Sequence, residues 1–308
     1  MKVSWYRLFY VYCMLSVCSS PALAADNIAA QDLYPQFSDT FDYVYGDYEQ
    51  AYGRVFHEDA VPYWWLVGVS TVALIALDEQ LLTASESLGR DLGIASEDKT
   101  TTFYNIGQFE IRFPTDLGSS LYFIGDGWTH SIIAAAFLGV GAWNDDDKAY
   151  NTGFQIIEGM ITTTIATQTI KHITGRESPF RATEPAGRWD FFPNQQTYME
   201  NIPAYDAFPS GHLAVGSMVL TVIHKNYPEK TWVLPTGVTL LSLLSFQMMN
   251  NGVHWASDYP LAIALGYTFG SIAYERGQNM QDDTISSHMS WAPIVEEGQL
   301  GLGFHYIF

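Results

Sequence analysis

The chain has 308 residues, 15% of them charged, and a formal net charge of -19 at neutral pH. This acidic balance argues against a nucleic-acid-binding protein and against electrostatic docking on anionic lipid. The length fits one large domain or two small ones.

Residues 1–24 have the pattern of a secretory signal. Lys2 and Arg7 precede an apolar stretch, and residues 19–24, SSPALA, supply the small side chains of a cleavage site. Cys13 and Cys18 both lie in this segment. We therefore expect an exported protein of a bacterial cell envelope, in the inner membrane or the periplasm, whose mature chain has no thiol, disulfide or thiolate metal site.

The next part of the chain predicts an N-terminal arm followed by helices. Residues 25–60 are polar and aromatic without a strong period. Six largely apolar segments, each long enough for a helix, are residues 61–77, 127–143, 153–170, 212–224, 231–249 and 259–274. Helices without a polar face are buried in protein or in lipid. Their lengths fall between about 20 residues for a membrane span and about 10 to 14 for a core helix. We favour membrane association, with a soluble periplasmic bundle as the alternative.

Two other regions stand apart from the helices. Residues 181–207 form a loop long enough to indicate a functional role. Residues 289–308 alternate apolar and polar side chains around Glu296-Glu297-Gly298, which predicts a β-hairpin. The expected fold is thus an all-α bundle of about six core helices over residues 61–276, with the arm at 25–60 and a tail at 277–308 that carries the small hairpin.

Residues 209–212, Pro-Ser-Gly-His, stand where a loop becomes a helix. Unpaired backbone N–H groups and the positive end of the helix dipole meet there, which makes a ready anion site. Ser210 would add a hydroxyl, Gly211 would let a ligand approach the backbone, and His212 would bring a proton that titrates near neutral pH. A plain serine N-cap followed by a structural histidine is the alternative.

His254 and Asp258 are four residues apart. On a helix this spacing puts both on one face, where the carboxylate accepts from one ring nitrogen and leaves the other free to attack. A simple surface contact is the alternative.

Lys171 and Arg176 follow an apolar segment and either complement a helix C-terminus or turn into the bundle to hold a phosphate.

The order Lys171, Pro-Ser-Gly-His, then His254 and Asp258, with apolar helices between, resembles the type 2 phosphatidic acid phosphatase (PAP2) and vanadium haloperoxidase superfamily over roughly residues 60–275. The resemblance implies that His254 is a nucleophile forming a phosphohistidine, oriented by Asp258. It also implies that His212 is the general acid.

The resemblance further implies that Lys171, Ser210 and the backbone of Gly211 bind the phosphoryl group. No metal and no other cofactor is implied.

The chain departs from the family patterns KxxxxxxRP and SRxxxxxHxxxD. Ser178 stands where the first has arginine, and Gln247 and Met248 stand where the second has serine and arginine. Two of three cations aimed at the phosphate are therefore replaced, and a preorganised charge contact to a transition state is typically worth several kcal/mol. Arg176, in a Thr-Gly-Arg turn where Gly175 permits unusual backbone angles, is the first candidate to compensate. Arg181 is the second.

We expect a phosphatase that hydrolyses a phosphate monoester, or a lipid phosphate or diphosphate, at the periplasmic side. The alternative is a catalytically degenerate envelope protein of this fold that binds a phosphate or a lipid without turnover. A vanadate-dependent haloperoxidase is a third reading, against which the replaced cations weigh more heavily. The expected partner is a phosphorylated small molecule or lipid and not nucleic acid, and the oligomeric state is left open.

Overall fold

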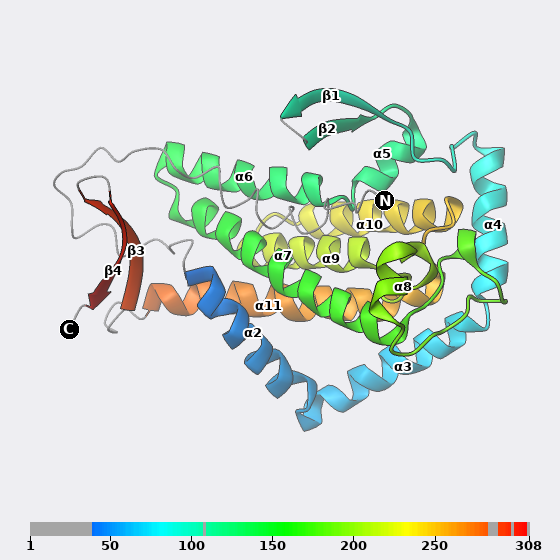
Figure 1. Ribbon diagram of the computed structural model, residues 1–308, viewed down its shortest axis with the longest axis horizontal. Helices are drawn as coiled ribbons and strands as arrows, with labels where there is room; N and C mark the ends of the chain where they lie inside the picture. The colour runs from blue at the N-terminus through cyan, green and yellow to red at the C-terminus, as the bar shows by residue number, and fades with distance from the viewer. Residues whose placement is uncertain (1–38, 107–108, 283–288, 297–298, 307–308) are drawn as a thin grey trace. The chain divides into compact units, whose positions relative to one another are not determined.

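Residues 39–106, 109–282, 289–296 and 299–306 are described in the computed structural model (Figure 1). The predicted signal segment and the first part of the predicted arm lie outside these residues. The longer helices are α2 Asp39–Val55, α3 Val61–Ile75, α4 Asp78–Asp91, α6 Gly127–Asn144, α7 Asp147–Thr174, α9 Gly211–Asn226, α10 Val233–Asn250 and α11 Tyr259–Asp282. The short α5 Leu117–Phe123 and α8 Gln195–Glu200 complete them. The predicted all-α bundle is confirmed.

Helix α9 lies at the centre of the bundle and packs against α11, α7, α10 and α6. Its Met218 and Val222 form one core cluster with Ile156 of α7 and Ala273 of α11. Close packing on α11 depends on glycine, because a Cβ on Gly266 would lie 2.3 Å from the carbonyl oxygen of Ala214.

The register of these contacts sets the direction of the helices. Gly266 meets Ala214, and Gly270, four residues further along α11, meets the carbonyl of Met218, four residues further along α9. The two helices therefore run parallel, and their N-terminal ends lie at the same end of the bundle. This end receives the segments that precede both helices, which contain the Pro-Ser-Gly-His motif and the His254–Asp258 pair.

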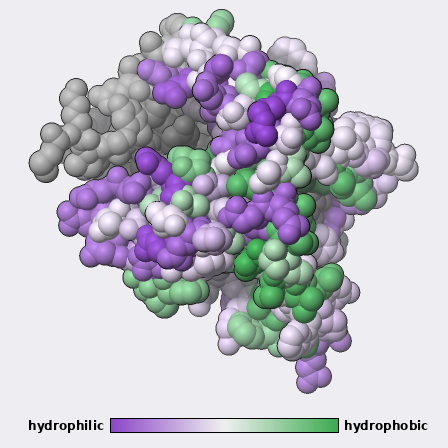
Figure 2. All heavy atoms as spheres, turned by 90° about the vertical axis from the view of Figure 1, so that its right-hand side faces the viewer, coloured by the Kyte–Doolittle hydropathy of each residue, from purple (hydrophilic) through white to green (hydrophobic). Residues whose placement is uncertain are grey.

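Helix α3 is apolar and lies at the surface. None of its fifteen described residues is buried, and α10 also exposes much of its length. The exposed apolar side chains of these two helices include Val61, Tyr63, Trp65, Leu66, Val69, Val72, Leu234, Val238, Leu240 and Leu243. Figure 2 shows hydrophobic side chains gathered in the lower part of the face that it presents. By length and composition, one helix in the described ranges, Val233–Asn250, is apolar enough to cross a membrane, or up to three spans exist if each of two bent pairs counts as one.

A sharp bend joins α3 to α4. The segment from Glu58 to Ile75 makes an angle of 69° with Asp78–Asp91. Asp78, the first residue of α4, is 1% exposed. Both α3 and α4 contact the short 3-10 helix η5, Ala256–Asp258. The bend therefore brings a buried carboxylate against the segment that carries the candidate histidine.

Two antiparallel hairpins accompany the helices. The predicted C-terminal hairpin is confirmed as β3 Met289–Glu296 paired with β4 Gln299–Tyr306. A second hairpin, β1 Thr100–Ile106 with β2 Phe109–Pro114, was not predicted.

Helix α2, within the predicted arm, packs against α7 and α11. The proposed domain boundaries remain a prediction.

Candidate active site

The Pro-Ser-Gly-His motif begins α9, as predicted. Ser210 is the N-cap, and its side chain accepts a hydrogen bond from the backbone N–H of Leu213 over 3.4 Å. Gly211 and His212 follow in the first turn and are partly exposed. A Cβ on Gly211 would lie 3.8 Å from Nζ of Lys171. The positive end of a helix and an ammonium group therefore meet beside the motif.

His254 and Asp258 are paired, although not on an α-helix. His254 lies in the turn between α10 and η5, and Asp258 ends η5. Nδ1 of His254 is 3.3 Å from Oδ2 of Asp258, which also accepts from the backbone N–H of Trp255 over 2.8 Å. The 3-10 turn brings the two side chains together as the helical spacing was expected to do. Nε2 of His254 has no hydrogen-bond partner within the described part of the chain.

The two candidate histidines come together at one end of the bundle. The ring centroids of His212 and His254 are 6.4 Å apart, and the ring planes make an angle of 68°. Tyr122 of α5 lies on the other side of His212, with its ring centroid at 4.8 Å. His254 is only 2% exposed, whereas His212 is half-buried, so His212 faces the more open side.

Lys171, in the last turn of α7, reaches the same place. Its side chain is 6% exposed, and Nζ is 3.4 Å from Oδ2 of Asp206. Asp206 lies just before the motif, in the loop that leads into α9. A carboxylate thus holds the ammonium group where the family resemblance puts a phosphate. Asp206 was not among the predicted site residues.

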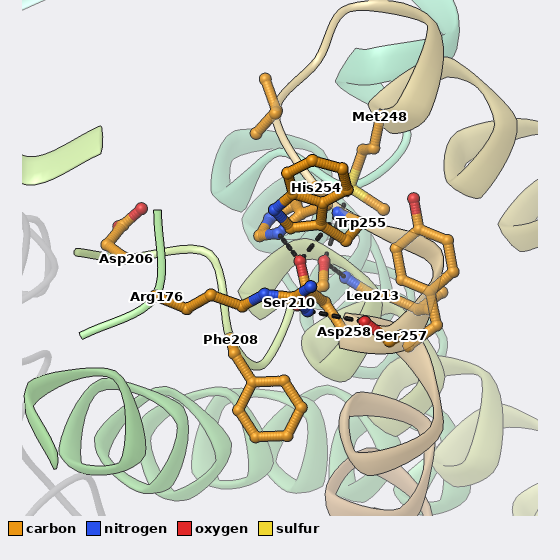
Figure 3. A network of polar contacts seen from close by, with 12 residues as sticks. Arg176, Asp206, Phe208, Ser210, Leu213, Met248, His254, Trp255, Ser257 and Asp258 are labelled. Atoms are coloured by element: carbon orange, nitrogen blue, oxygen red, sulfur yellow. Dashed lines mark hydrogen bonds and ion pairs between the residues drawn. The ribbon is translucent and has the colours of Figure 1, made fainter. Parts of the chain in front are cut away.

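Arg176 lies in the interior, against the His254–Asp258 pair. Gly175 has a left-handed φ of 53° and ends α7, so the predicted unusual turn is present. The turn directs Arg176 into the interior, where Nη1 donates to Asp258 (Figure 3). Nη2 donates to Asp78. The side chain is 0% exposed. Its guanidinium therefore contacts the carboxylate of Asp258, the partner of His254. Arg181, the second candidate to compensate for the replaced cations, is exposed, and its guanidinium lies over the ring of Phe180.

Neutral, buried side chains stand where the family patterns have cations. Met248 is 0% exposed, and its sulfur is 3.5 Å from Oγ of Ser210. Ser178 is 2% exposed, and its backbone N–H donates to the carbonyl of Pro203. Gln247, which stands where the family pattern has serine, is 1% exposed and donates from Nε2 to the carbonyl of Ala95. The structure thus packs these positions as part of the protein interior.

Two polar residues that were not predicted as site residues, Asp78 and Ser257, lie against the site. Asp78 accepts from the backbone N–H and the hydroxyl of Ser257 over 3.0 and 2.6 Å. The only sequence signal was the acidic pair Asp78-Glu79 directly after an apolar segment. Such a pair is also typical of a helix start, where acidic side chains complement the dipole.

Comparison with protein-family models agrees with the motifs. The family model described as the PAP2 superfamily matches residues 152–281. Among solved structures, the crystal structure of Aquifex aeolicus LpxE is similar, with 17% sequence identity and a TM-score of 0.39 over 51% of this chain and 83% of that chain. A search of curated proteins found no match. The resemblance drawn from the three motifs is confirmed by the family model, whose match over residues 152–281 includes all three of them.

Proposed function

We propose that the chain hydrolyses a phosphate monoester, or a lipid phosphate or diphosphate, with His254 as the nucleophile and His212 as the general acid. The observation that carries the proposal is the approach of the two imidazoles, whose centroids are 6.4 Å apart. Transfer of a phosphoryl group to a histidine needs an attacking nitrogen on one side of phosphorus and a proton donor for the leaving oxygen on the other.

Each bond change then has a residue to perform it. Nε2 of His254 attacks phosphorus, the bond from phosphorus to the ester oxygen breaks, and His212 gives that oxygen a proton. Water next attacks the phosphohistidine, His212 takes up a proton from the water, and the nitrogen–phosphorus bond breaks to release phosphate. The contact of Nδ1 with Asp258, at 3.3 Å, favours the tautomer in which Nε2 carries the lone pair.

The groups that would hold the phosphoryl oxygens are those around the start of α9. The backbone N–H groups of Gly211 and His212 lie in its first turn, and Lys171 approaches from α7. Ser210 supplies a hydroxyl at the same point. These donors are preorganised by the fold, which is the main way that an enzyme stabilises developing negative charge.

The exposed apolar surfaces of α3 and α10 favour a membrane-associated protein, and hence an amphiphilic phosphate as the substrate. Such surfaces on a soluble monomer rarely exceed a few hundred Å² unless they mark a contact with a partner or with lipid. The predicted secretory signal would put the site at the periplasmic side of the envelope.

The second candidate, a protein that binds without turnover, has an observation of its own. Met248 and Ser178 are 0% and 2% exposed and stand at the two positions where the family patterns have arginine. An active site with fewer cations stabilises the transition state less. A single assay of phosphate release distinguishes the two candidate functions.

The test uses the purified full chain and an aryl phosphate monoester, with release of inorganic phosphate as the readout. Turnover that falls to the buffer rate in His254→Gln supports the phosphatase. The matched control is His57→Gln, which changes an exposed histidine beside η2, Glu58–Ala60, and is expected to keep the wild-type rate. A wild-type chain that binds phosphate but releases none supports the second candidate.

A further inference from the structure

We propose that Arg176 and Asp78 form a positioning pair that fixes Asp258, and through it the ring of His254. This inference rests on the proposed function. It adds to the catalytic motifs a residue of α4, because Asp78 lies outside residues 152–281 that match the family model.

The hydrogen bonds of Arg176 carry the first step. A guanidinium has five N–H groups in a rigid fork, and five contacts use them. Nη1 donates to Oδ1 of Asp258 and to Oγ of Ser257, both over 2.6 Å. Nη2 donates to Oδ2 of Asp78 and to the carbonyl of Ala186, both over 2.7 Å, and Nε donates to the same carbonyl over 3.3 Å. The fork is thus used within the protein, and its role is to hold other groups in place.

Asp78 completes the arrangement from the other side. One of its oxygens accepts from the backbone N–H of Ser257, and the other accepts from the hydroxyl of Ser257 and from Arg176. Ser257 directly precedes Asp258 in η5. Asp78 therefore fixes the backbone of the turn. Arg176 fixes the carboxylate at its end (Figure 3).

The two carboxylate oxygens of Asp258 make different contacts. Oδ1 accepts from Arg176, whereas Oδ2 accepts from the N–H of Trp255 and faces Nδ1 of His254. With one oxygen held by a guanidinium, the carboxylate cannot rotate away from the imidazole. The orientation of the attacking nitrogen consequently depends on Arg176.

The charges of Asp78, Arg176 and Asp258 also favour attack by His254. Asp78, Arg176 and Asp258 have side chains that are 0% exposed and together carry one negative charge in excess. A buried charge without a partner is costly. The imidazole of His254 becomes positive as Nε2 bonds phosphorus, and it is the group next to Oδ2. The excess negative charge therefore stabilises the ring more in the transition state than before attack.

A strained backbone supports the pair. Ala186 has a φ of 58°, in the left-handed region that alanine rarely adopts. This turns its carbonyl towards Arg176, and its N–H donates to Glu79, the neighbour of Asp78, over 2.8 Å. Strain of this kind persists where the surroundings hold it, and it is most common at functional sites.

The experiment measures kcat and KM of the full chain for an aryl phosphate monoester in Asp78→Asn, which is nearly isosteric, and in Ser257→Ala, which removes one hydroxyl. We expect kcat to fall about 100-fold in the first, as for a misplaced catalytic group, and about tenfold in the second, with KM within about twofold of wild type. The fall in kcat alone distinguishes positioning from substrate binding.

The matched control is Asp47→Asn. Asp47 of α2 is also a buried carboxylate paired with an arginine, Arg276 of α11. Arg276 lies roughly 26 Å along α11 from Tyr259, the residue that follows Asp258, by helix rise. This variant is expected to lower stability while leaving kcat of the folded protein unchanged. An equal fall of kcat in Asp47→Asn would assign the effect to general destabilisation and overturn the proposal.

Nitrogen NMR of the histidine side chains in the full chain supplies a readout that does not depend on activity. In the wild type we expect Nδ1 of His254 to carry the proton, and in Asp78→Asn and Arg176→Lys we expect both tautomers. If kcat and the tautomer are both unchanged in Asp78→Asn, the inference fails while His254-dependent turnover stands. If His254→Gln keeps its turnover, the proposed function fails, and the tautomer still tests whether the pair positions the ring.

Discussion

Arg176 donates to Oδ1 of Asp258 over 2.6 Å, and Asp258 is the residue that faces the candidate nucleophile His254. Arg176, two residues before the position where the family pattern has arginine, is thus bound to the carboxylate that faces His254. The cation that remains beside the two histidines is Lys171, which Asp206 holds at 3.4 Å. This arrangement leads to a first prediction about substrate binding.

Replacing Asp206 with asparagine is expected to lower KM for an aryl phosphate about threefold to tenfold, which corresponds to about 1 kcal/mol. The carboxylate competes with the phosphate for Lys171, and its removal also ends the repulsion between two anions. Steady-state kinetics at low ionic strength measures the change. Asp190→Asn is the matched control, since it removes a carboxylate of the same loop that pairs with Arg188. An unchanged or raised KM in Asp206→Asn would contradict the role given to Lys171.

Replacing Met248 with arginine restores a cation of the family pattern within a closed interior. Because Met248 is 0% exposed, the unpaired charge is expected to destabilise the fold by about 3 kcal/mol or more. Thermal melting should show that orthovanadate or inorganic phosphate recovers more stability in this variant than in the wild type. Met199→Arg, at a position that is 56% exposed, serves as the control. Equal effects of the anion on both proteins would show that Met248 does not border the anion site.

Glu158 of α7 makes stability depend on pH. Burial raises the pKa of Glu158 from 4.5 to about 8, although Arg276 lies 3.1 Å from it and favours the ionised form. Since the folded state holds the proton more tightly, this contribution to stability is full below pH 4.5 and is lost as pH rises through about 8. In Glu158→Gln the difference between the melting temperatures at the two ends of this range should shrink. An unchanged difference would mean that Glu158 ionises normally.

Gly266→Ala tests the parallel packing that brings the site together. Its Cβ would lie 2.3 Å from the carbonyl oxygen of Ala214, so α9 and α11 must separate. Denaturant unfolding is expected to give a loss of about 1–3 kcal/mol, with lower turnover because the two histidines move apart. Gly139→Ala is the matched control, since a Cβ there meets nothing within 4 Å, and it should be neutral or stabilising by up to about 1 kcal/mol. Equal losses of unfolding free energy in both variants would show that the close contact of Gly266 with α9 contributes nothing specific to stability.

The sequence predicted the parts of the fold that local patterns determine. Apolar segments of helical length became helices, Ser210 became an N-cap, and Gly175 adopted the left-handed turn expected of it. The hairpin at residues 100–114 was missed because its alternation is interrupted, with a register shift between Thr102 and Tyr104.

Features that depend on long-range packing could not be predicted in the same way. The approach of His212 to His254 was inferred from the family motifs, since nothing local joins the two segments. The contact of Asp78 with Ser257 joins residues 179 positions apart and depends on the bend between α3 and α4. The direction of Arg176 depends on the same contact, because two buried carboxylates draw a guanidinium inward.

The most direct test of the account is to trap the covalent intermediate. The full chain is mixed with an aryl phosphate labelled on phosphorus, quenched in base within the first turnover and digested for peptide mapping. The account predicts a base-stable, acid-labile phosphate on His254 in the wild type and none in His254→Gln. Turnover without a label on His254, or a label on another residue, would contradict it.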